Sequence, residues 1–193
     1  MQFHLTISSW VIDPRCPAKR LQFSREPGHS IVGNLVSVLR QLAIGSGTTI
    51  GMVDTSGAPF GISVAYNCAD FDAAITNDAW GLQVGGGVAA VQMTDYKLSA
   101  KILHGVGALN LAYSGSSISA PVFTGSKAYF LVGRNFSRVA AGSITVYETG
   151  LVARKTPATV YYWLYCRDVL ATPKVVGSGQ VLSVEYEIAL TTS

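Results

Sequence analysis

The feature that most constrains the fold is a repeated alternation of apolar and polar residues in short stretches from about residue 48 to the end of the chain. The clearest stretch alternates strictly through Leu182, Ser183, Val184, Glu185, Tyr186, Glu187 and Ile188. Neighbouring side chains of a β-strand point to opposite faces, so this pattern predicts a strand with one buried face.

Similar stretches predict further strands at 48–53, 61–66, 80–84, 109–113, 118–123, 127–133, 144–148 and 159–166. Glycine, serine, asparagine and aspartate separate them. Short strands with turn signals roughly every 8–12 residues are typical of a sandwich or barrel. We therefore expect a mainly β fold, a single β-sandwich or jelly-roll-like domain.

One segment has helical rather than strand spacing. Apolar residues recur at Ile31, Leu35, Val38 and Leu42, which predicts an amphipathic helix over 30–44. Ser30 is suited to cap its start, and glycines follow its end. The helix could pack on the sheet, or it could also contact a neighbouring subunit. A shorter helical turn is expected at 95–102.

The first 28 residues differ from the rest. Phe3, Leu5 and Ile7 alternate with polar residues as in a short strand, and prolines then interrupt the pattern at Pro14, Pro17 and Pro27. Proline-rich segments favour extended backbone. We expect 1–28 to be an extended N-terminal arm, and 29–193 to contain the helix and the β-sandwich.

The composition favours a protein that is covered by neighbours. Charged residues make up 13% of the chain, against a typical value of about 25%, and hydrophobic residues make up 49%. A solitary soluble domain usually carries a more charged surface. Low charge therefore indicates oligomeric assembly, although an ordinary β-domain with a Ser/Thr/Gly surface would also fit.

The net charge and the cysteine spacing argue against several classes of ligand and cross-link. The net charge is +3 with no concentrated basic patch, so we do not expect nucleic acid as a specific ligand. The mildly basic residues among the first 40 fit a solvated arm, or an arm that faces nucleic acid or an acidic partner. Three cysteines without CxxC spacing predict neither a disulfide framework nor zinc. No stretch has the roughly 18 apolar residues of a membrane helix, and the N-terminus lacks a secretory pattern.

A search for catalytic signatures predicts a protein that is not an enzyme and binds no cofactor. The three histidines, His4, His29 and His104, lie in no metal-ligand spacing, and no G-x-S-x-G elbow occurs. The glycines at 85–87 and 105–107 complete no phosphate-binding motif and predict turns or bulges. Asp70, Asp72 and Asp78 could hold a hard cation, but they supply only part of a calcium loop, so a polar loop is expected.

The stretch 159–166 carries Tyr161, Tyr162, Trp163 and Tyr165. Aromatic residues on both faces of a strand indicate a core strand, a subunit interface or a sugar-binding platform, the last formed with Trp80. The candidate interface residues are Phe3, Leu5, Ile7, Trp10, Pro14, Pro17, Arg20, Leu35, Tyr161 and Trp163.

Several longer segments resemble a domain of structural proteins in tailed bacteriophages. In the C-terminal half these are SKAYFLVGRNFSRVAAGSITVYETGLV (126–152), YYWLYCRDVL (161–170) and GSGQVLSVEYEIAL (177–190). Upstream, GLQVGGGVAAVQMTDYKLSAKILHG (81–105) is similar to the same family's glycine-containing strand. HSIVGNLVSVLRQL (29–42) is similar to its helix, which carries an asparagine at the position of Asn34.

This resemblance implies a β-rich virion component near the portal, neck or tail, and it implies no catalytic residues. We expect a homo-oligomer with cyclic symmetry that contacts other virion proteins. It is expected to be made in the host bacterial cytoplasm and to reside in the virion. The alternatives are a receptor- or carbohydrate-binding module of a tail or head fibre, and a capsid decoration protein.

Overall fold

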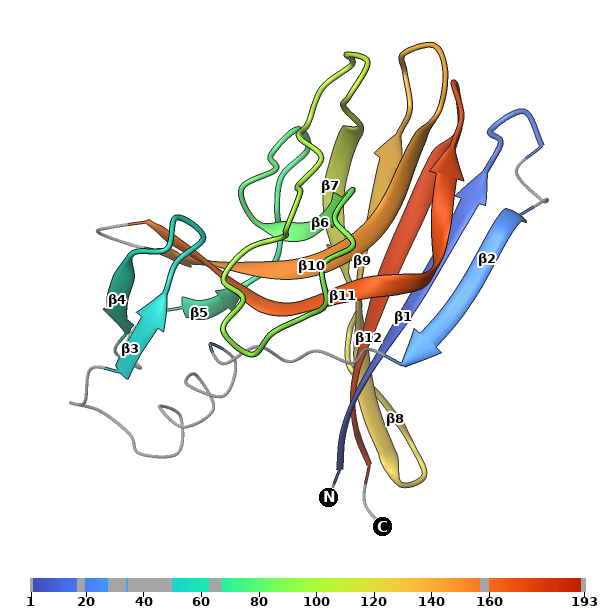
Figure 1. Ribbon diagram of the computed structural model, residues 1–193. Helices are drawn as coiled ribbons and strands as arrows, with labels where there is room; N and C mark the ends of the chain where they lie inside the picture. The colour runs from blue at the N-terminus through green and yellow to red at the C-terminus, as the bar shows by residue number, and fades with distance from the viewer. Residues whose placement is uncertain are drawn as a thin grey trace.

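The computed structural model describes residues 2–16, 20–27, 34, 50–62, 67–156 and 160–191, which fold mainly as β-strands (Figure 1). The strands are β1 (Gln2–Ile12), β2 (Arg20–Pro27), β3 (Ile50–Val53), β4 (Pro59–Ile62), β5 (Asn67–Asp70), β6 (Gly81–Gly85), β7 (Ala112–Ile118), β8 (Val122–Thr124), β9 (Lys127–Ser137), β10 (Ile144–Thr156), β11 (Tyr161–Val176) and β12 (Val181–Thr191). The expectation of a mainly β protein is confirmed.

Two antiparallel sheets make up the body. The larger has the order β2-β1-β12-β9-β7, with β8 also paired to β9. The smaller has the order β11-β10-β5, with β6 also paired to β10, and β3 and β4 form a separate hairpin. In Figure 1, the long curved strands β10 and β11 cross the larger sheet. The fold is therefore a two-layer, sandwich-like arrangement.

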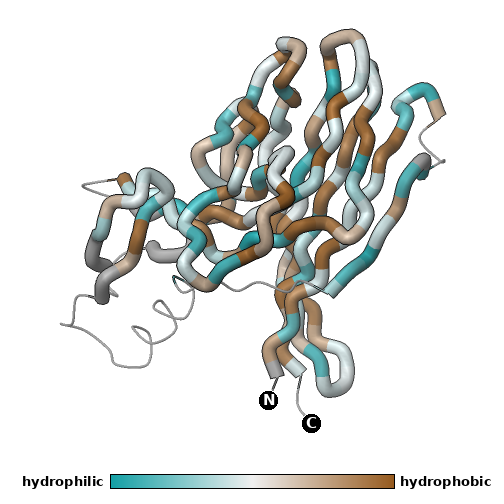
Figure 2. Tube along the Cα trace, in the orientation of Figure 1, coloured by the Kyte–Doolittle hydropathy of each residue, from teal (hydrophilic) through white to brown (hydrophobic). Residues whose placement is uncertain are grey.

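The two sheets share one hydrophobic core. Leu182, Val184 and Tyr186 are buried on the inner face of β12, and Trp163 and Leu151 are buried on the smaller sheet. Figure 2 shows the corresponding alternation of hydrophilic and hydrophobic residues along the strands of the larger sheet. Each such side chain contributes roughly 1.5–3 kcal/mol when fully buried, so this interface is the main source of stability.

Within the first 27 residues, the described strands 2–12 and 20–27 form part of the larger sheet instead of a separate arm. β1 pairs with β12 from Gln2↔Thr191 to Ile12↔Val181, and β2 pairs with the other edge of β1. Leu5, Ile7 and Val11 point inward and are buried. The apolar half of the alternating N-terminal pattern therefore belongs to the core of this chain.

The two helical predictions have different outcomes. The helix expected at 30–44 lies outside the described residues except for Asn34, so the described residues do not support it. The helical turn expected at 95–102 is wrong, because this segment is an irregular loop. Its backbone N–H groups at Ser99 and Ala100 donate to the side chain of Glu148 and not to helical carbonyls.

Candidate functional site

The most elaborate polar cluster is centred on Glu148, a fully buried residue of β10. Its carboxylate accepts backbone hydrogen bonds from Gly87 (3.2 Å), Ser99 (3.1 Å) and Ala100 (2.7 Å). On neighbouring β11, Arg167 donates Nε to Glu148 Oε2 at 2.7 Å. The register of β10 against β11 shifts beside Glu148, as expected where a bulge redirects a side chain. One carboxylate thus joins two strands and a loop.

Arg167 extends this cluster toward the surface. It also donates to Asp95 Oδ2 at 2.8 Å and to the carbonyl of Ala89 at 2.9 Å. Burial disfavours its charge, but the hydrogen bonds and charges of Glu148 and Asp95 outweigh burial and raise the pKa of Arg167. Glu148 and Arg167 together hold loop 86–104 against the smaller sheet.

The triple glycine at 85–87 is explained by the same carboxylate. A Cβ on Gly85 or on Gly87 would lie 2.5 Å from Glu148 Oε1, whereas a Cβ on Gly86 would meet nothing within 4 Å. Two of the three glycines therefore allow close approach of backbone to Glu148. A phosphate at this position would meet a buried negative charge, so the glycines serve packing.

A second buried arginine holds another loop. Arg134, on the inner face of β9, donates to the carbonyls of Ala74, Asn77, Trp80, Leu82 and Ser114 at 2.5–3.2 Å. Its guanidinium also lies 4.9 Å from the ring centroid of Tyr113. Burial lowers the pKa of Arg134. Most of its N–H donors are hydrogen-bonded to loop 71–80 and to the start of β6, and they hold these segments in place.

A third buried arginine joins two loops at one end of the molecule. Arg138 donates to the carbonyls of Gly107 (3.0 Å), Asn110 (3.1 Å) and Ala141 (2.9 Å). These loops, 103–111 and 138–143, lie together at the top of Figure 1. Their relative position is therefore fixed by hydrogen bonds from a buried cation.

These two loops expose apolar side chains to solvent. Val106 is 65% exposed, Leu109 is 81% exposed and Val139 is 56% exposed. We call these three residues the apolar tip. Exposed apolar side chains on loops that are held in a fixed position can form part of a contact surface.

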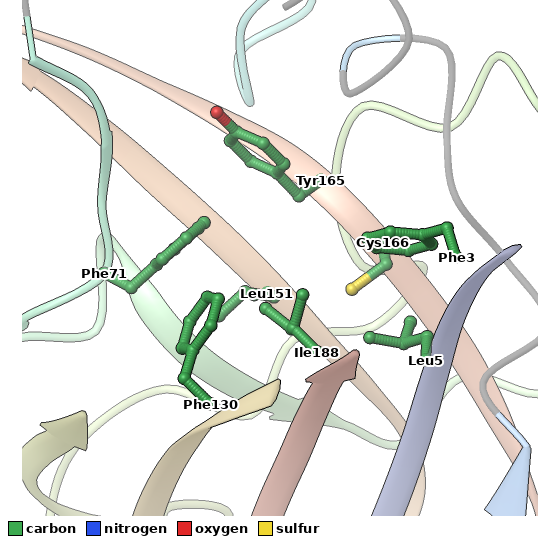
Figure 3. Close-up of a pocket in the computed structure, with 8 residues that line it drawn as sticks. All are labelled: Phe3, Leu5, Phe71, Phe130, Leu151, Tyr165, Cys166 and Ile188. Atoms are coloured by element: carbon green, nitrogen blue, oxygen red, sulfur yellow. The ribbon is translucent and has the colours of Figure 1, made fainter. Parts of the chain in front are cut away.

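Figure 3 shows the apolar cavity between the two sheets, where Phe71, Phe130, Leu151 and Ile188 extend toward one another. Its volume is about 140 Å³, and its remaining lining residues are Phe3, Leu5, Tyr165 and Cys166. Burial raises the pKa of the Cys166 thiol well above its usual value, which disfavours the nucleophilic thiolate. The cavity can hold a small apolar group, whereas a polar substrate would lose its hydration there.

The predicted interface residues fall into several environments. Leu5, Ile7 and Trp163 are buried within this chain, so they cannot form a surface contact in this fold. Phe3 is partly exposed beside the cavity, and Pro14 is exposed in the β1–β2 turn. The guanidinium of Arg20 is exposed and stacks 4.7 Å above the ring of Trp10, whereas Tyr161 packs partly buried against the core. Pro17 and Leu35 lie outside the described residues.

The sugar platform predicted from Tyr161, Trp163 and Trp80 does not form. Tyr161 and Trp163 pack into the core between the sheets, whereas Trp80 stacks on Tyr162 at 5.8 Å on the opposite face of β11. Adjacent residues of a strand point in opposite directions, which separates these rings. The core-strand interpretation of 161–165 is correct.

Two of the three acidic residues in 70–78 form ion pairs with basic side chains. Asp70 forms an ion pair with Arg154 at 2.5 Å, and Asp78 accepts from Lys101 at 3.3 Å and from the backbone N–H of His104 at 2.7 Å. Asp72 is exposed. Within the described part of the chain, no three metal-ligating side chains gather at one point. Asp70 and Asp78 are therefore already engaged by Arg154 and Lys101.

Asn34, which the resemblance singled out, makes two hydrogen bonds to the backbone of Val53, at 2.8 and 3.1 Å. Sequence reasoning missed four other polar residues that organise the fold: Glu148, Arg167, Arg134 and Arg138. A usable signal existed, because charged residues that interrupt apolar strands are rarely buried without partners. The four charged residues also lie within the quoted segments 126–152 and 161–170, which was a second signal that they matter for the fold.

None of the helical structure in the described ranges is long and apolar enough to cross a membrane. Comparison with known proteins gives no match to any family model, curated protein or solved structure. The functional assignment therefore depends on the geometry of this chain and on the sequence motifs.

Proposed function

We propose that the protein is a structural subunit of a tailed-bacteriophage particle, present in several copies in a ring or layer at the portal, neck or tail. The observation that carries this proposal is the apolar tip, Val106, Leu109 and Val139, which Arg138 holds in a fixed arrangement. A preformed apolar surface loses little conformational entropy on binding, so it suits permanent contact with another subunit.

The buried polar clusters support a scaffold role. Glu148, Arg167 and Arg134 direct their hydrogen bonds mainly to backbone groups of loops 71–80 and 86–104. Such clusters fix loop shape, and in a particle every copy must present the same loops to its neighbours. The resemblance of residues 81–190 to structural proteins of tailed phages supports a phage particle as the assembly.

The proposed partners are other copies of the chain, in a homo-oligomer that is cyclic, and other virion proteins. The chain is made in the bacterial cytoplasm and resides in the virion. Its charged fraction of 13% suits a protein whose surface is largely covered by neighbours.

The test is to purify particles from a producing culture by density gradient and quantify this chain by mass spectrometry. Immunogold electron microscopy then locates it. We expect a fixed copy number and labelling at the portal, neck or tail, and incorporation should fall sharply for Leu109→Asp. The matched control is Asp72→Asn, an exposed site away from the tip. A chain that stays entirely in the soluble fraction contradicts the proposal.

A second candidate is a carbohydrate-binding role, favoured by a groove on the outer face of the larger sheet. The groove has a volume of about 200 Å³, and it combines the aromatic wall of Trp10 with polar side chains from Asn135, Ser183 and Glu185. An aromatic ring beside amide, hydroxyl and carboxylate groups can stack on and hydrogen-bond to a sugar. Glycan-array binding that is lost in Trp10→Ala supports this role, and absence of binding to any glycan removes it.

A further inference from the structure

Side chains and loops cover several strand edges of the two sheets, but they leave the outer edge of β2 open among the described residues. This difference points to a specific subunit contact. At the free edge of β11, the side chain of Gln22 donates to the carbonyl of Val175 at 2.7 Å and accepts from its N–H at 3.0 Å. Glu26 accepts from the N–H of Ala171 at 2.8 Å. Side chains of β2 therefore occupy backbone groups that another strand would need.

Loops close two other edges. Loop 99–104 forms backbone hydrogen bonds with β6, and loop 71–77 forms them with β7. Farther along β11, Thr55 donates its N–H to the carbonyl of Tyr162 at 2.9 Å. These contacts remove most opportunities for strand pairing on the smaller sheet and on the β7 side of the larger one.

Among the described residues, the outer edge of β2 has no such cover. Across residues 20–27, no described group hydrogen-bonds to the β2 backbone on the side away from β1. This edge is eight residues long, whereas β5 has four residues and β8 has three. An uncovered strand of this length is a template for pairing with another chain.

We propose that β2 pairs antiparallel with β2 of a second copy, around a two-fold axis that passes beside Ser24. The inference rests on the proposed multi-copy assembly and names a contact that joins its copies in pairs, in addition to the contacts that successive neighbours make around a ring. The pairing would join two six-stranded sheets into one continuous sheet. It is isologous, because both copies contribute the same strand.

The side chains of β2 favour this register. Phe23 is 54% exposed, and the side chain of Arg25 is 59% exposed with a long 3.7 Å contact to Glu187. With the axis at Ser24, each Phe23 lies opposite Arg25 of the partner subunit on the outer face, which allows a cation–π contact twice. An axis at Arg25 would instead place two like charges opposite each other, which is destabilising.

Two experiments test the contact. In a Cys16→Ser background, Ser24→Cys should cross-link under mild oxidation, because directly opposed strand residues have Cα atoms about 4.5–5.5 Å apart. Phe23→Cys is the matched control and should cross-link at least ten-fold less, since it is not opposite itself in this register. Equal cross-linking of the two variants overturns the proposed register.

Sedimentation equilibrium of the whole chain tests the edge independently. Phe23→Lys should weaken dimerisation at least ten-fold, while Phe123→Lys, which replaces another exposed phenylalanine, 78% exposed on β8, leaves it unchanged. Association unaffected by Phe23→Lys, or a wild-type monomer at every concentration, overturns the β2 contact. A β2-dependent dimer that never enters particles supports the contact and contradicts the proposed function, so the two failures are distinguishable.

Discussion

Replacing Glu148 with glutamine should destabilise the protein strongly. The substitution keeps the size of the side chain but removes the charge opposite Arg167, and it places an amide NH₂ where backbone N–H groups of Gly87, Ser99 and Ala100 now donate. Breaking a buried ion pair costs about 3–5 kcal/mol, and an unpaired buried N–H costs about 1–3 kcal/mol.

The combined loss is about 4 kcal/mol, since some donors can still reach the remaining oxygen. For a chain of this length, such a loss lowers Tm by about 8–16 °C. Urea unfolding followed by tryptophan fluorescence measures the change in the free energy of unfolding. Glu187→Gln is the control: this carboxylate pairs with Lys127 at 2.8 Å near the surface, so its loss should cost less than about 1 kcal/mol. Equal effects of the two substitutions refute the assignment of Glu148 as the buried centre.

Three further outcomes follow from the structure. Gly85→Ala should cost about 1–3 kcal/mol by overpacking against Glu148, while Gly86→Ala should be nearly neutral; equal thermal stabilities would contradict the close approach. Lys174 is fully buried, its Nζ has no hydrogen-bond partner among the described residues and burial lowers its pKa, so Lys174→Met should stabilise the fold by about 1 kcal/mol. Between the lowered pKa of Lys174 in the folded protein and 10.5 in the unfolded chain, the unfolded state binds more protons, so the stability of the wild-type protein rises with pH. The stability difference between Lys174→Met and wild type therefore shrinks as the pH rises, and denaturation at two pH values checks this sign. At pH 8 the exposed Cys16 should react with iodoacetamide while Cys166 stays unmodified until unfolding, as peptide mass spectrometry would show; rapid labelling of Cys166 would contradict its burial.

The strands were the most predictable part of the fold. β9, β10 and β12 contain the predicted stretches at 127–133, 144–148 and 182–188, because one face of each is buried and imposes strict alternation. β11 extends to Val176, well beyond the predicted end at 166. Register shifts interrupt its pairing with β10, and Pro173 lies in its later half, so a simple period of two could not reveal the full strand.

The hydrogen-bond partners of the buried polar residues could not be predicted from local sequence patterns. Glu148 and Ala100 are 48 residues apart in sequence, and Arg134 reaches Ala74 across 60 residues. Such contacts depend on which loops cover which strands, and alternation says nothing about this. The same limitation explains the N-terminus: its alternation indicated a strand, but only the sheet order shows that β1 lies between β2 and β12.

Hydrogen exchange of the chain free and assembled tests the central claim most directly. The free form can be supplied by Phe23→Lys or by dilution, and the assembled form by purified particles. The assembly account predicts that assembly slows exchange in β2 and in loops 103–111 and 138–143, while the already buried segment 146–152 changes little. Identical exchange in both forms at β2 and at both loops would contradict a protein that acts through these surfaces.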